Sequence, residues 1–379
     1  MGYGVIFDEA IRRIFSKPLQ WYHSLYMSEI ALYRKYRPAK FKEVVGQEPI
    51  IKALEGSIAS GQVAHAYLFA GPRGTGKTSI ARIFAEELGC TGNDLYEIDG
   101  ASNNGVGEIR ELREAVGSLP FSSPYKVYII DEVHMLSNAA FNALLKTLEE
   151  PPRHVIFILA TTELHKVPET VVSRCQTFRF HQPEIPALQK HIKEVAKKEG
   201  YTIDEKSSHL IALLSEGSFR DALGTLQKVM VSSGDKKLTI GEVEKITGAP
   251  KRELIKDFLL GLITADADRA LTTIANLSRD GVEAKVMLRL ALEELRRGML
   301  AGYAPELLGD NYLAVDEDEL AFYQELASHD NAKFLSAILR ELLTAYAETG
   351  LATIQSLPVE LAIISIVKQI KLSTQNEEK

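Results

Sequence analysis

The stretch Gly71-Pro72-Arg73-Gly74-Thr75-Gly76-Lys77-Thr78 predicts the fold of this chain more strongly than any other. It fits the pattern G-x-x-x-x-G-K-[ST] of a phosphate-binding loop. The apolar run Ala66–Ala70 before it predicts a buried strand, and residues 79–88 after it carry an apolar stripe at helical spacing. A strand, a glycine-rich loop and a helix in this order direct backbone N–H groups and a helix N-terminus at an anion.

Each residue type in this loop has an expected task. Glycines let the backbone wrap around phosphates without Cβ clashes. The lysine supplies a mobile charge for the β- and γ-phosphates, and the hydroxyl after it is a ligand for Mg²⁺. The nucleotide-binding residues expected here are Gly71, Gly74, Thr75, Gly76, Lys77, Thr78 and Ser79.

Two carboxylates follow a later predicted strand. The apolar run Val127–Ile130 ends in Asp131 and Glu132. Downstream of a phosphate loop, Asp131 is expected to hold Mg²⁺ directly or through water. Glu132 is expected to orient and polarise the attacking water. The loop and the acidic pair together predict hydrolysis of a nucleoside triphosphate.

Further strands are predicted at 95–99, 155–160 and 176–180, with helical patterns between them. This alternation predicts an α/β fold with a mostly parallel, five-stranded open sheet and helices on both faces. Ligands bind such sheets beyond the carboxyl ends of the strands. Thr162 follows the fourth strand and could contact the γ-phosphate or the water, although a threonine at a strand end is often structural.

The loop 100–107 is polar and glycine-rich, and it opens a helix that contains Arg110. Amides at such a helix start can bind phosphate. The alternative is an ordinary connection with solvated arginines. Ser102, Asn103 and Arg110 are therefore candidates whose role the local pattern leaves open.

After Pro183 the pattern becomes helical, with Thr239–Glu242 as a capping box and a break at 248–250. Pro358 is expected to separate the last two helices. The last long helical region could be a self-contained bundle or an oligomerisation surface. Residues 1–30 read as a helical extension, docked or loose, with a partner-binding helix as the alternative. The predicted domains are 1–30, 31–182, 183–248 and 249–371, followed by a disordered tail at 372–379.

Composition sets limits on the class of protein. The chain has 379 residues, 45% of them hydrophobic and 25% charged, with a net charge of −7, which suits a globular protein of two or three domains. Its two cysteines, Cys90 and Cys175, allow no disulfide framework and no four-cysteine zinc site. We expect a reducing, cytoplasmic compartment. No apolar run reaches the roughly 18 residues of a membrane helix, so no membrane association is expected.

Taken together, these motifs resemble the AAA+ ATPase family, and within it the gamma/tau subunits of the bacterial DNA polymerase III clamp loader. The resemblance covers about residues 31–250. Beyond Pro250 only length and helical character match, as in the oligomerising collar of that family. The segments that carry it are Leu32–Pro38, Val45–Gln47, His65–Phe69, Gly71–Thr78, Asp131–Leu136, Ala143–Pro152 and Ser173–Cys175.

The resemblance implies a P-loop AAA+ domain at 31–182, a helical lid at 183–248 and an all-α collar at 249–371. Thr162 would be the first sensor, and Arg220 the second, linking lid and γ-phosphate. Arg174 would reach into the ATP site of a neighbouring subunit, where a cation stabilises charge developing on the γ-phosphate. The residues that would surround the adenine are Tyr33, Arg37, Val44 and Val45, and those that would track the DNA backbone are Ser102, Asn103 and Arg110.

The expected function is that of an ATP- and Mg²⁺-dependent motor subunit that opens the sliding clamp and loads it onto primer–template DNA. It would act in a pentameric loader with other subunits and have no polymerase site of its own. Alternatives are a non-hydrolysing structural subunit, disfavoured by the intact Lys77 and Glu132, or another AAA+ DNA-processing ATPase. Relatives usually carry a four-cysteine zinc module after the phosphate-loop helix. Here Cys90 leads almost directly to Leu95, so no zinc is expected. The chain resembles the short, gamma-like form, and candidates for clamp contact are Phe121–Tyr125 and Met135–Leu148.

Overall fold

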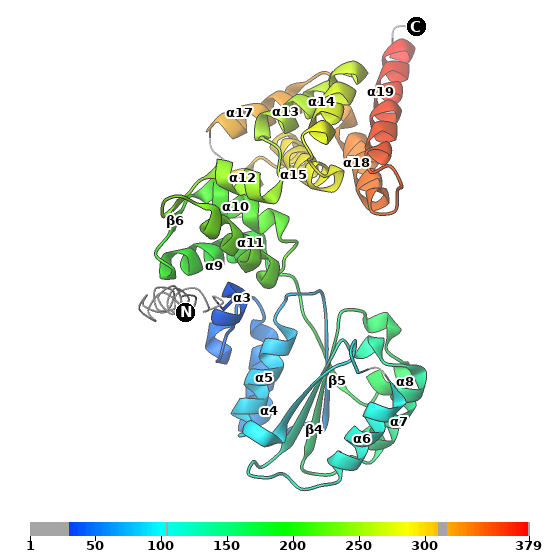
Figure 1. Ribbon diagram of the computed structural model, residues 1–379. Helices are drawn as coiled ribbons and strands as arrows, with labels where there is room; N and C mark the ends of the chain where they lie inside the picture. Colours follow the sequence, from blue (N-terminus) through cyan, green and yellow to red (C-terminus); the bar gives the residue numbers. More distant parts are fainter. Residues whose placement is uncertain (1–29, 104, 310–316, 378–379) are drawn as a thin grey trace, which may run out of the picture. The chain divides into compact units, whose positions relative to one another are not determined.

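The computed structural model describes residues 30–103, 105–309 and 317–377 (Figure 1). The predicted extension, apart from Ile30, lies outside the described residues. The chain divides into two compact units, Met1–Arg37 and Pro38–Lys379. In the first unit the described residues form one short helix, α3 (Leu32–Lys35), where the guanidinium of Arg34 lies 5.8 Å from the centre of the Tyr33 ring.

The second unit begins with a five-stranded parallel sheet in the order β2-β3-β4-β1-β5, which confirms the predicted α/β fold class. Every residue of β1 is buried, as expected for a central parallel strand that is covered on both faces. The edge strands β2 and β5 are more exposed. The bounds are β1 Ala66–Ala70, β2 Leu95–Asp99, β3 Lys126–Asp131, β4 Val155–Thr161 and β5 Gln176–Arg179.

Helices cover both faces of this sheet (Figure 1). Alternate residues of β1 enter different cores because strand side chains point to opposite faces. Tyr67 and Phe69 belong to the core shared with α4 (Glu48–Ala59) and α5 (Lys77–Glu87), and Leu68 to the core on the other side. The helices on that other side are α6 Val106–Val116, α7 Asn138–Glu149 and α8 Glu169–Val172. The connections of this domain contain four 3-10 turns: η1 Phe41–Glu43, η2 Gly92–Asp94, η3 Val133–Met135 and η4 Leu164–Lys166.

A small helical domain follows the sheet. Asp204 and Ser218 cap two of its helices by accepting hydrogen bonds from the backbone N–H groups of Ser207 (2.7 Å) and Asp221 (3.2 Å). The predicted capping box at Thr239 is present. Two very short strands, β6 (Thr202–Ile203) and β7 (Lys237–Leu238), pair in parallel, which the purely helical prediction missed. The helices are α9 Ile185–Lys198, α10 Glu205–Leu214, α11 Phe219–Ser232 and α12 Ile240–Thr247.

The last domain is an all-helical bundle with one continuous apolar core. Two predictions fail here. Pro358 lies in the first turn of α19 (Leu357–Glu377) rather than between helices, because a helix tolerates proline where the N–H has no acceptor. Residues 372–377 continue that helix instead of forming a disordered tail. The other elements are α13 Arg252–Ile263, α14 Ala267–Arg279, α15 Ala284–Tyr303, α16 Glu306–Gly309, α17 Glu317–Ser328, η5 Ala332–Phe334 and α18 Leu335–Thr349.

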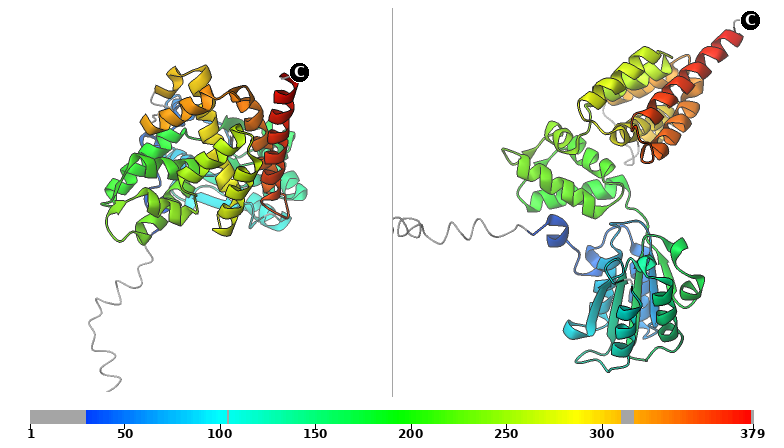
Figure 2. Two further views of the ribbon diagram at one scale, coloured as in Figure 1. Left: turned by 90° about the horizontal axis from the view of Figure 1, so that it is seen from above. Right: turned by 45° about the vertical axis from the view of Figure 1, so that its right-hand side comes forward.

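Helix α19 is apolar on two faces, and only one of them is covered. Its inner face, including Ile363 and Ile366, is buried against the bundle, where α19 packs along α18 and α14 (Figure 2). Its outer face leaves large apolar side chains in solvent at helical spacing, and the preceding turn adds more. This outer ridge consists of Leu351 (89% exposed), Ile354 (60%), Leu357 (41%), Leu361 (57%) and Ile364 (52%).

Candidate nucleotide site

The phosphate loop starts where β1 ends in the middle of the sheet. Its first residue is tied to the neighbouring strand, because the N–H of Gly71 donates to the carbonyl of Thr161 over 3.1 Å. A Cβ at Gly71 would lie 2.4 Å from the carbonyl oxygen of Phe180, and one at Gly74 would lie 2.0 Å from Oγ of Ser218. Close neighbours on both sides therefore require glycine at these two positions.

Helix α5 begins inside the loop. Gly76 precedes it in the left-handed region, with φ 98°, and no described side chain caps the helix. The N–H groups of its first turn therefore point forward as an anion site. Thr75 is buried, and its hydroxyl donates to the carbonyl of Pro72 over 2.9 Å, which fixes the curve of the loop.

Lys77 lies inside the loop that it follows. Its ammonium donates to the carbonyls of Gly71 (2.7 Å) and Pro72 (2.9 Å), and the residue is only 6% exposed. Burial lowers the pKa of Lys77, the carboxylates of Glu132 and Asp131 oppose this, and the charge of Arg220 adds to the lowering. The predicted carboxylates and Arg220 therefore all act on the pKa of Lys77.

Thr78 and Asp131 meet at the loop edge of the sheet. The hydroxyl of Thr78 donates to Oδ2 of Asp131 over 2.6 Å, across 53 positions of sequence. The other carboxylate oxygen accepts the N–H of Glu132 over 3.0 Å. A hydroxyl beside a carboxylate offers the oxygen ligands that Mg²⁺ prefers, so these two residues fit the ion predicted for them.

Glu132 stands at the end of β3 in an unusual backbone conformation. Its φ of 47° lies in the left-handed region, which costs a non-glycine residue about 1–2 kcal/mol. Its Oε2 accepts the hydroxyl of Thr162 over 3.1 Å. Gly100, which follows β2, leaves the space for this carbonyl, because a Cβ there would lie 2.8 Å from the carbonyl oxygen of Glu132. The predicted base and first sensor are therefore in direct contact.

His134 was not predicted as a site residue. It lies in η3, just after the acidic pair, and its side chain is 6% exposed. Its Nδ1 is 3.1 Å from the hydroxyl of Thr161 and 3.5 Å from Oε2 of Glu132, and its Nε2 is 3.6 Å from Oε1 of Glu163. The only sequence signal was its place in Asp131–Leu136, three residues after Asp131.

The lid touches the loop through the start of α11. The N–H of Phe219 donates to the carbonyl of Gly74 over 3.1 Å, next to the close approach of Ser218. Arg220, the predicted second sensor, is the second residue of this helix. The charge of Arg220 contributes to lowering the pKa of Lys77.

The segment expected to hold the base is anchored by a residue that the predictions missed. Gln47 is 1% exposed, and its Nε2 donates to the carbonyl of His181 over 2.7 Å. Val44 packs against the core that contains α5, and Val45 is half-buried next to it. Tyr33 and Arg37 belong to the first unit, Met1–Arg37.

Arg174 and Cys175 follow α8 and behave differently. Arg174 is 35% exposed at its side chain and donates to the carbonyl of Thr170 (2.7 Å) and to Oε1 of Glu149 (2.8 Å). Burial raises the pKa of the Cys175 thiol to about 12, which keeps the thiol protonated and disfavours it as a nucleophile. Arg174 is thus a surface cation at the end of a short helix.

Two of the residues predicted to contact DNA are hydrogen-bonded to Asp99, the last residue of β2. The hydroxyl of Ser102 donates to Oδ2 of Asp99 over 2.8 Å, and the side-chain amide of Asn103 donates to the carbonyl of Asp99 over 3.0 Å. Both follow the end of β2. Arg110 lies in α6, and its side chain is outside the described residues. The turn is therefore fixed by Asp99, with Ser102 exposed on its surface.

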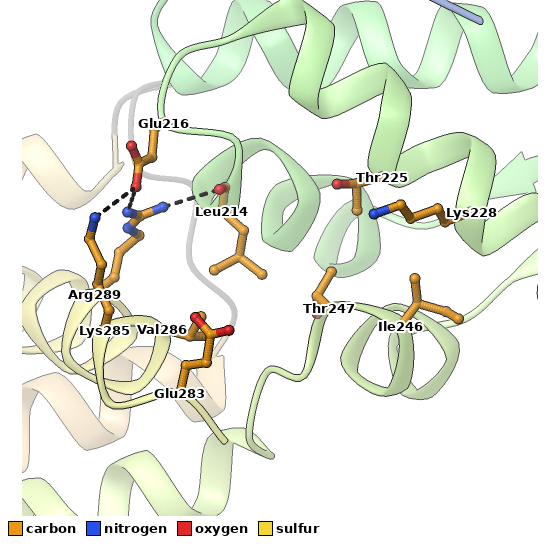
Figure 3. A pocket seen from close by; sticks show the side chains of 10 residues that line it. All are labelled: Leu214, Glu216, Thr225, Lys228, Ile246, Thr247, Glu283, Lys285, Val286 and Arg289. Atoms are coloured by element: carbon orange, nitrogen blue, oxygen red, sulfur yellow. Dashed lines mark hydrogen bonds and ion pairs between the residues drawn. The ribbon is translucent and has the colours of Figure 1, made fainter. Parts of the chain in front are cut away.

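The turn that leads into α11 is held by the last domain (Figure 3). Glu216 has φ 49° and Gly217 has φ 71°, so two successive residues are left-handed. The Gln182 side chain donates to the carbonyl of Glu216 over 2.8 Å. Arg289 of α15 donates to the carbonyl of Leu214 over 3.1 Å and forms an ion pair with Glu216.

Within ranges 30–103, 105–309 and 317–377, no group of three or more His, Cys, Asp and Glu residues is arranged to hold a metal ion. Over the same ranges, every helix is too short or too polar to cross a membrane. Cys90 is buried, and its thiol donates to the carbonyl of Asp94 over 3.2 Å.

A parallel sheet with a phosphate loop in its centre, an acidic strand end beside it and a helical lid touching the loop defines a P-loop ATPase of the AAA+ class. Residues 46–105 and 93–184 match the family model for the DNA polymerase III delta subunit, and residues 238–378 match domain III of DNA polymerase III subunits gamma and tau. The chain is 39% identical to DNA polymerase III subunit tau of Bacillus subtilis strain 168, over 90% of this chain and 63% of that protein.

It is also 33% identical to DNA polymerase III subunit gamma of Buchnera aphidicola subsp. Schizaphis graminum, over 90% of this chain and 98% of that protein. The chain belongs to the DNA polymerase III gamma/tau subunit family. It spans 63% of the Bacillus subtilis relative and 48% of the Escherichia coli K12 one. Among solved structures it is similar to the Thermotoga maritima RuvB Holliday junction branch migration motor, with 25% identity, a TM-score of 0.49, and coverage of 60% of this chain and 79% of that one.

Proposed function

We propose that this chain is an ATP-hydrolysing subunit of a bacterial replicative clamp loader, which opens a ring-shaped sliding clamp and places it on primer–template DNA in the cytoplasm. The observation that carries the proposal is the bond between Thr78 and Asp131 beside Lys77 and Glu132. A structural subunit without turnover would not need this set. Family membership supplies the clamp-loading context.

Binding of ATP would use the loop and the helix behind it. The amides at the start of α5 and the ammonium of Lys77 would hold the β- and γ-phosphates. Thr78 and Asp131 would hold Mg²⁺, which supplies positive charge to the phosphate oxygens when bound. Tyr33, Arg37, Val44 and Val45 would surround the adenine, and Ser79 would bind the nucleotide next to Thr78.

Hydrolysis would depend on residues from the chain's own strand ends and from a neighbour. Glu132 would take up the proton of the attacking water. Thr162 would contact the γ-phosphate from the sheet, and Arg220 would contact it from the lid. Arg174, paired with Glu149 at the surface, would enter the ATP site of the adjacent subunit and stabilise developing charge there.

Assembly would use the collar. The outer ridge of α19, from Leu351 to Ile364, exposes five large apolar side chains, and exposed apolar patches mark interaction sites. We infer that it contacts other loader subunits in a pentamer. Ser102, Asn103 and Arg110 would follow the phosphate backbone of the duplex without reading bases.

The test is ATPase turnover of the assembled loader, with and without clamp and primed DNA. Arg174→Ala should still assemble but lose stimulated turnover by about 10³-fold, the effect of removing an arginine finger. Arg153→Ala is the matched control, because Arg153 is also exposed and precedes a strand, β4, at the same end of the sheet, but it lies outside the segment Ser173–Cys175. Full stimulated turnover in Arg174→Ala would refute the trans assignment. Absence of any turnover in the assembled wild type would favour the structural subunit.

A further inference from the structure

The side chain of His134 connects the two strand ends that carry the predicted base and the first sensor. It is 6% exposed, so its contacts are made inside the protein. On one edge of the ring, Nδ1 lies 3.1 Å from the hydroxyl of Thr161 and 3.5 Å from Oε2 of Glu132. On the other edge, Nε2 lies 3.6 Å from Oε1 of Glu163. The imidazole therefore lies among residues from both β3 and β4.

Glu132 needs such support. Its backbone is left-handed, and a non-glycine residue keeps that conformation only where its surroundings fix it. The N–H of Met135 donates to its carbonyl over 2.9 Å, and Thr162 donates to its carboxylate over 3.1 Å. The imidazole of His134 also lies next to that carboxylate. Among the described contacts, it joins Glu132 to Thr161, the residue before Thr162.

Thr161 fixes the orientation of the ring. It is completely buried, and its hydroxyl oxygen accepts the N–H of Glu163 over 3.0 Å. That bond fixes the oxygen, which can accept a second hydrogen bond from Nδ1. A proton on Nδ1 would then face both this oxygen and Oε2 of Glu132, and the contact with Thr161 sets the ring. With the ring set, the position of the Glu132 carboxylate relative to Thr162 follows. A base held in this way is oriented before the substrate arrives, which is what positioning requires.

We propose that His134 is a positioning residue for ATP hydrolysis: it holds the carboxylate of Glu132 in register with Thr162 and binds no substrate itself. This inference rests on the proposed function, because it assigns to Glu132 the role of base. It predicts that the Nδ1 edge matters for catalysis and the Nε2 edge does not. It also predicts that loss of the ring slows turnover and leaves nucleotide affinity intact, because no atom of the ring contacts the phosphate loop in the described structure.

The variants separate the two edges. An asparagine amide occupies the place of Nδ1, and a glutamine amide reaches that of Nε2. His134→Ala should lower kcat of the assembled loader by about 10- to 100-fold, the effect of a base misplaced by about 1 Å. KM and the Kd for a fluorescent ATP analogue should stay within about twofold of wild type, since binding and turnover are separable. His134→Asn should recover most of kcat, and His134→Gln should not.

His165→Ala is the matched control. His165 also lies 3.6 Å from Glu163, at Oε2, but its side chain is 77% exposed. We expect it to have wild-type kcat. Full turnover in His134→Ala, or equal rescue by asparagine and glutamine, would overturn the proposal. A parallel rise of KM and fall of thermal stability in all three His134 variants would also overturn it, because a purely structural histidine behaves in that way.

Hydrogen exchange provides a readout that does not need activity. The amide of Met135 is protected by its bond to Glu132, so His134→Ala should speed exchange in the peptide around residues 131–137, and His134→Asn should restore protection. If the wild-type loader hydrolyses no ATP, the proposed function is wrong. Hydrogen exchange would still show whether His134 stabilises the conformation of Glu132. Unchanged exchange in His134→Ala would refute that support.

Discussion

The phosphate loop and the lid turn both contain residues with positive φ, but they reach this conformation by different means. In the loop the left-handed positions are glycines, such as Gly74 (φ 75°) and Gly76 (φ 98°). In the lid turn a side-chain-bearing residue, Glu216 (φ 49°), takes the first of two such positions. It is held there by Gln182 and by Arg289, which lie 34 and 73 positions away in sequence.

The difference separates local from long-range specification. Glycine adopts these conformations without a steric penalty, so the loop is encoded by its own residues. A glutamate does so only where other parts of the protein compensate. The lid turn, which leads directly to Ser218 and Arg220, therefore links the nucleotide site to the domain that supplies Arg289. The following variants act on one side of this comparison or the other.

The largest effect is expected in the loop. Gly74→Ala puts a Cβ 2.0 Å from Oγ of Ser218 at a φ of 75°, so backbone strain and overpacking should together cost about 2–5 kcal/mol. Gly76→Ala is the matched variant, because its Cβ would meet nothing within 4 Å, and strain alone should cost about 1–2 kcal/mol. Thermal unfolding and ATP-analogue binding measure both. Adding Ser218→Gly should restore part of the stability and ATP-analogue binding lost in Gly74→Ala, but not those lost in Gly76→Ala. Equal losses in the two single variants would show that the contact with the lid is unimportant.

The next effect concerns pH and the contact between α10 and α15. Burial lowers the pKa of His209 to about 4, and the charge of Arg297 adds to the lowering. Nε2 of the neutral ring lies 2.9 Å from Nη2 of Arg297, so it accepts a hydrogen bond that protonation would remove. Because the unfolded chain takes up this proton near pH 6.5, stability is complete above that value and falls as the pH drops toward 4.

The slope in that window should approach about 1.4 kcal/mol for each pH unit. Denaturant unfolding at pH 7, 6 and 5 measures it. His209→Gln keeps an acceptor that does not titrate, so it should flatten the slope. His165→Gln, at an exposed position, should leave the slope as in wild type. A wild-type slope in His209→Gln would show that other groups cause the acid sensitivity.

The smallest effect is expected at the lid turn. Arg289→Ala removes a side chain that is 16% exposed, pairs with Glu216 and donates to the carbonyl of Leu214, at a cost of about 1–2 kcal/mol. Arg296→Ala, on the same helix, removes a 50% exposed arginine that lies 3.8 Å from Glu293 and should cost about 0–1 kcal/mol. The free energy of unfolding is measured for both variants. The rate of hydrogen exchange at residues 214–219 should rise only in Arg289→Ala. An equal rise in Arg296→Ala would show that Arg289 does not hold this turn specifically.

The sequence predicted the sheet almost to the residue, and the physical reason is local. Apolar runs such as Val127–Ile130 must be buried on both faces, and the phosphate loop fixes which strand comes first. The pair of Thr78 and Asp131 was predicted for the same reason, because each belongs to a motif that can be recognised in one stretch. The structure then brings them to 2.6 Å.

What was missed depends on pairs of ordinary residues far apart in sequence. Gln47 and His181, or His134 and Glu163, carry no pattern that separates them from surface polar residues before the fold is known. Pro358 was misplaced because the rule that proline ends a helix has an exception in the first turn. The roles of Arg174, Arg220 and the adenine-side residues stay predictions, because they depend on a bound nucleotide or on a neighbouring subunit.

The outer ridge of α19 has a consequence for how the protein is made. Exposed leucines and isoleucines that are buried in an assembly stay in solvent when the chain is alone, and there they promote nonspecific aggregation. Supply of the other subunits would then govern how much of this chain stays usable, since surplus copies would go to chaperones and proteases. The soluble yield of this chain should therefore be higher when the other subunits are co-expressed than when it is expressed alone. Replacing Leu361 by a charged residue should raise the yield of the chain expressed alone and lower the yield on co-expression.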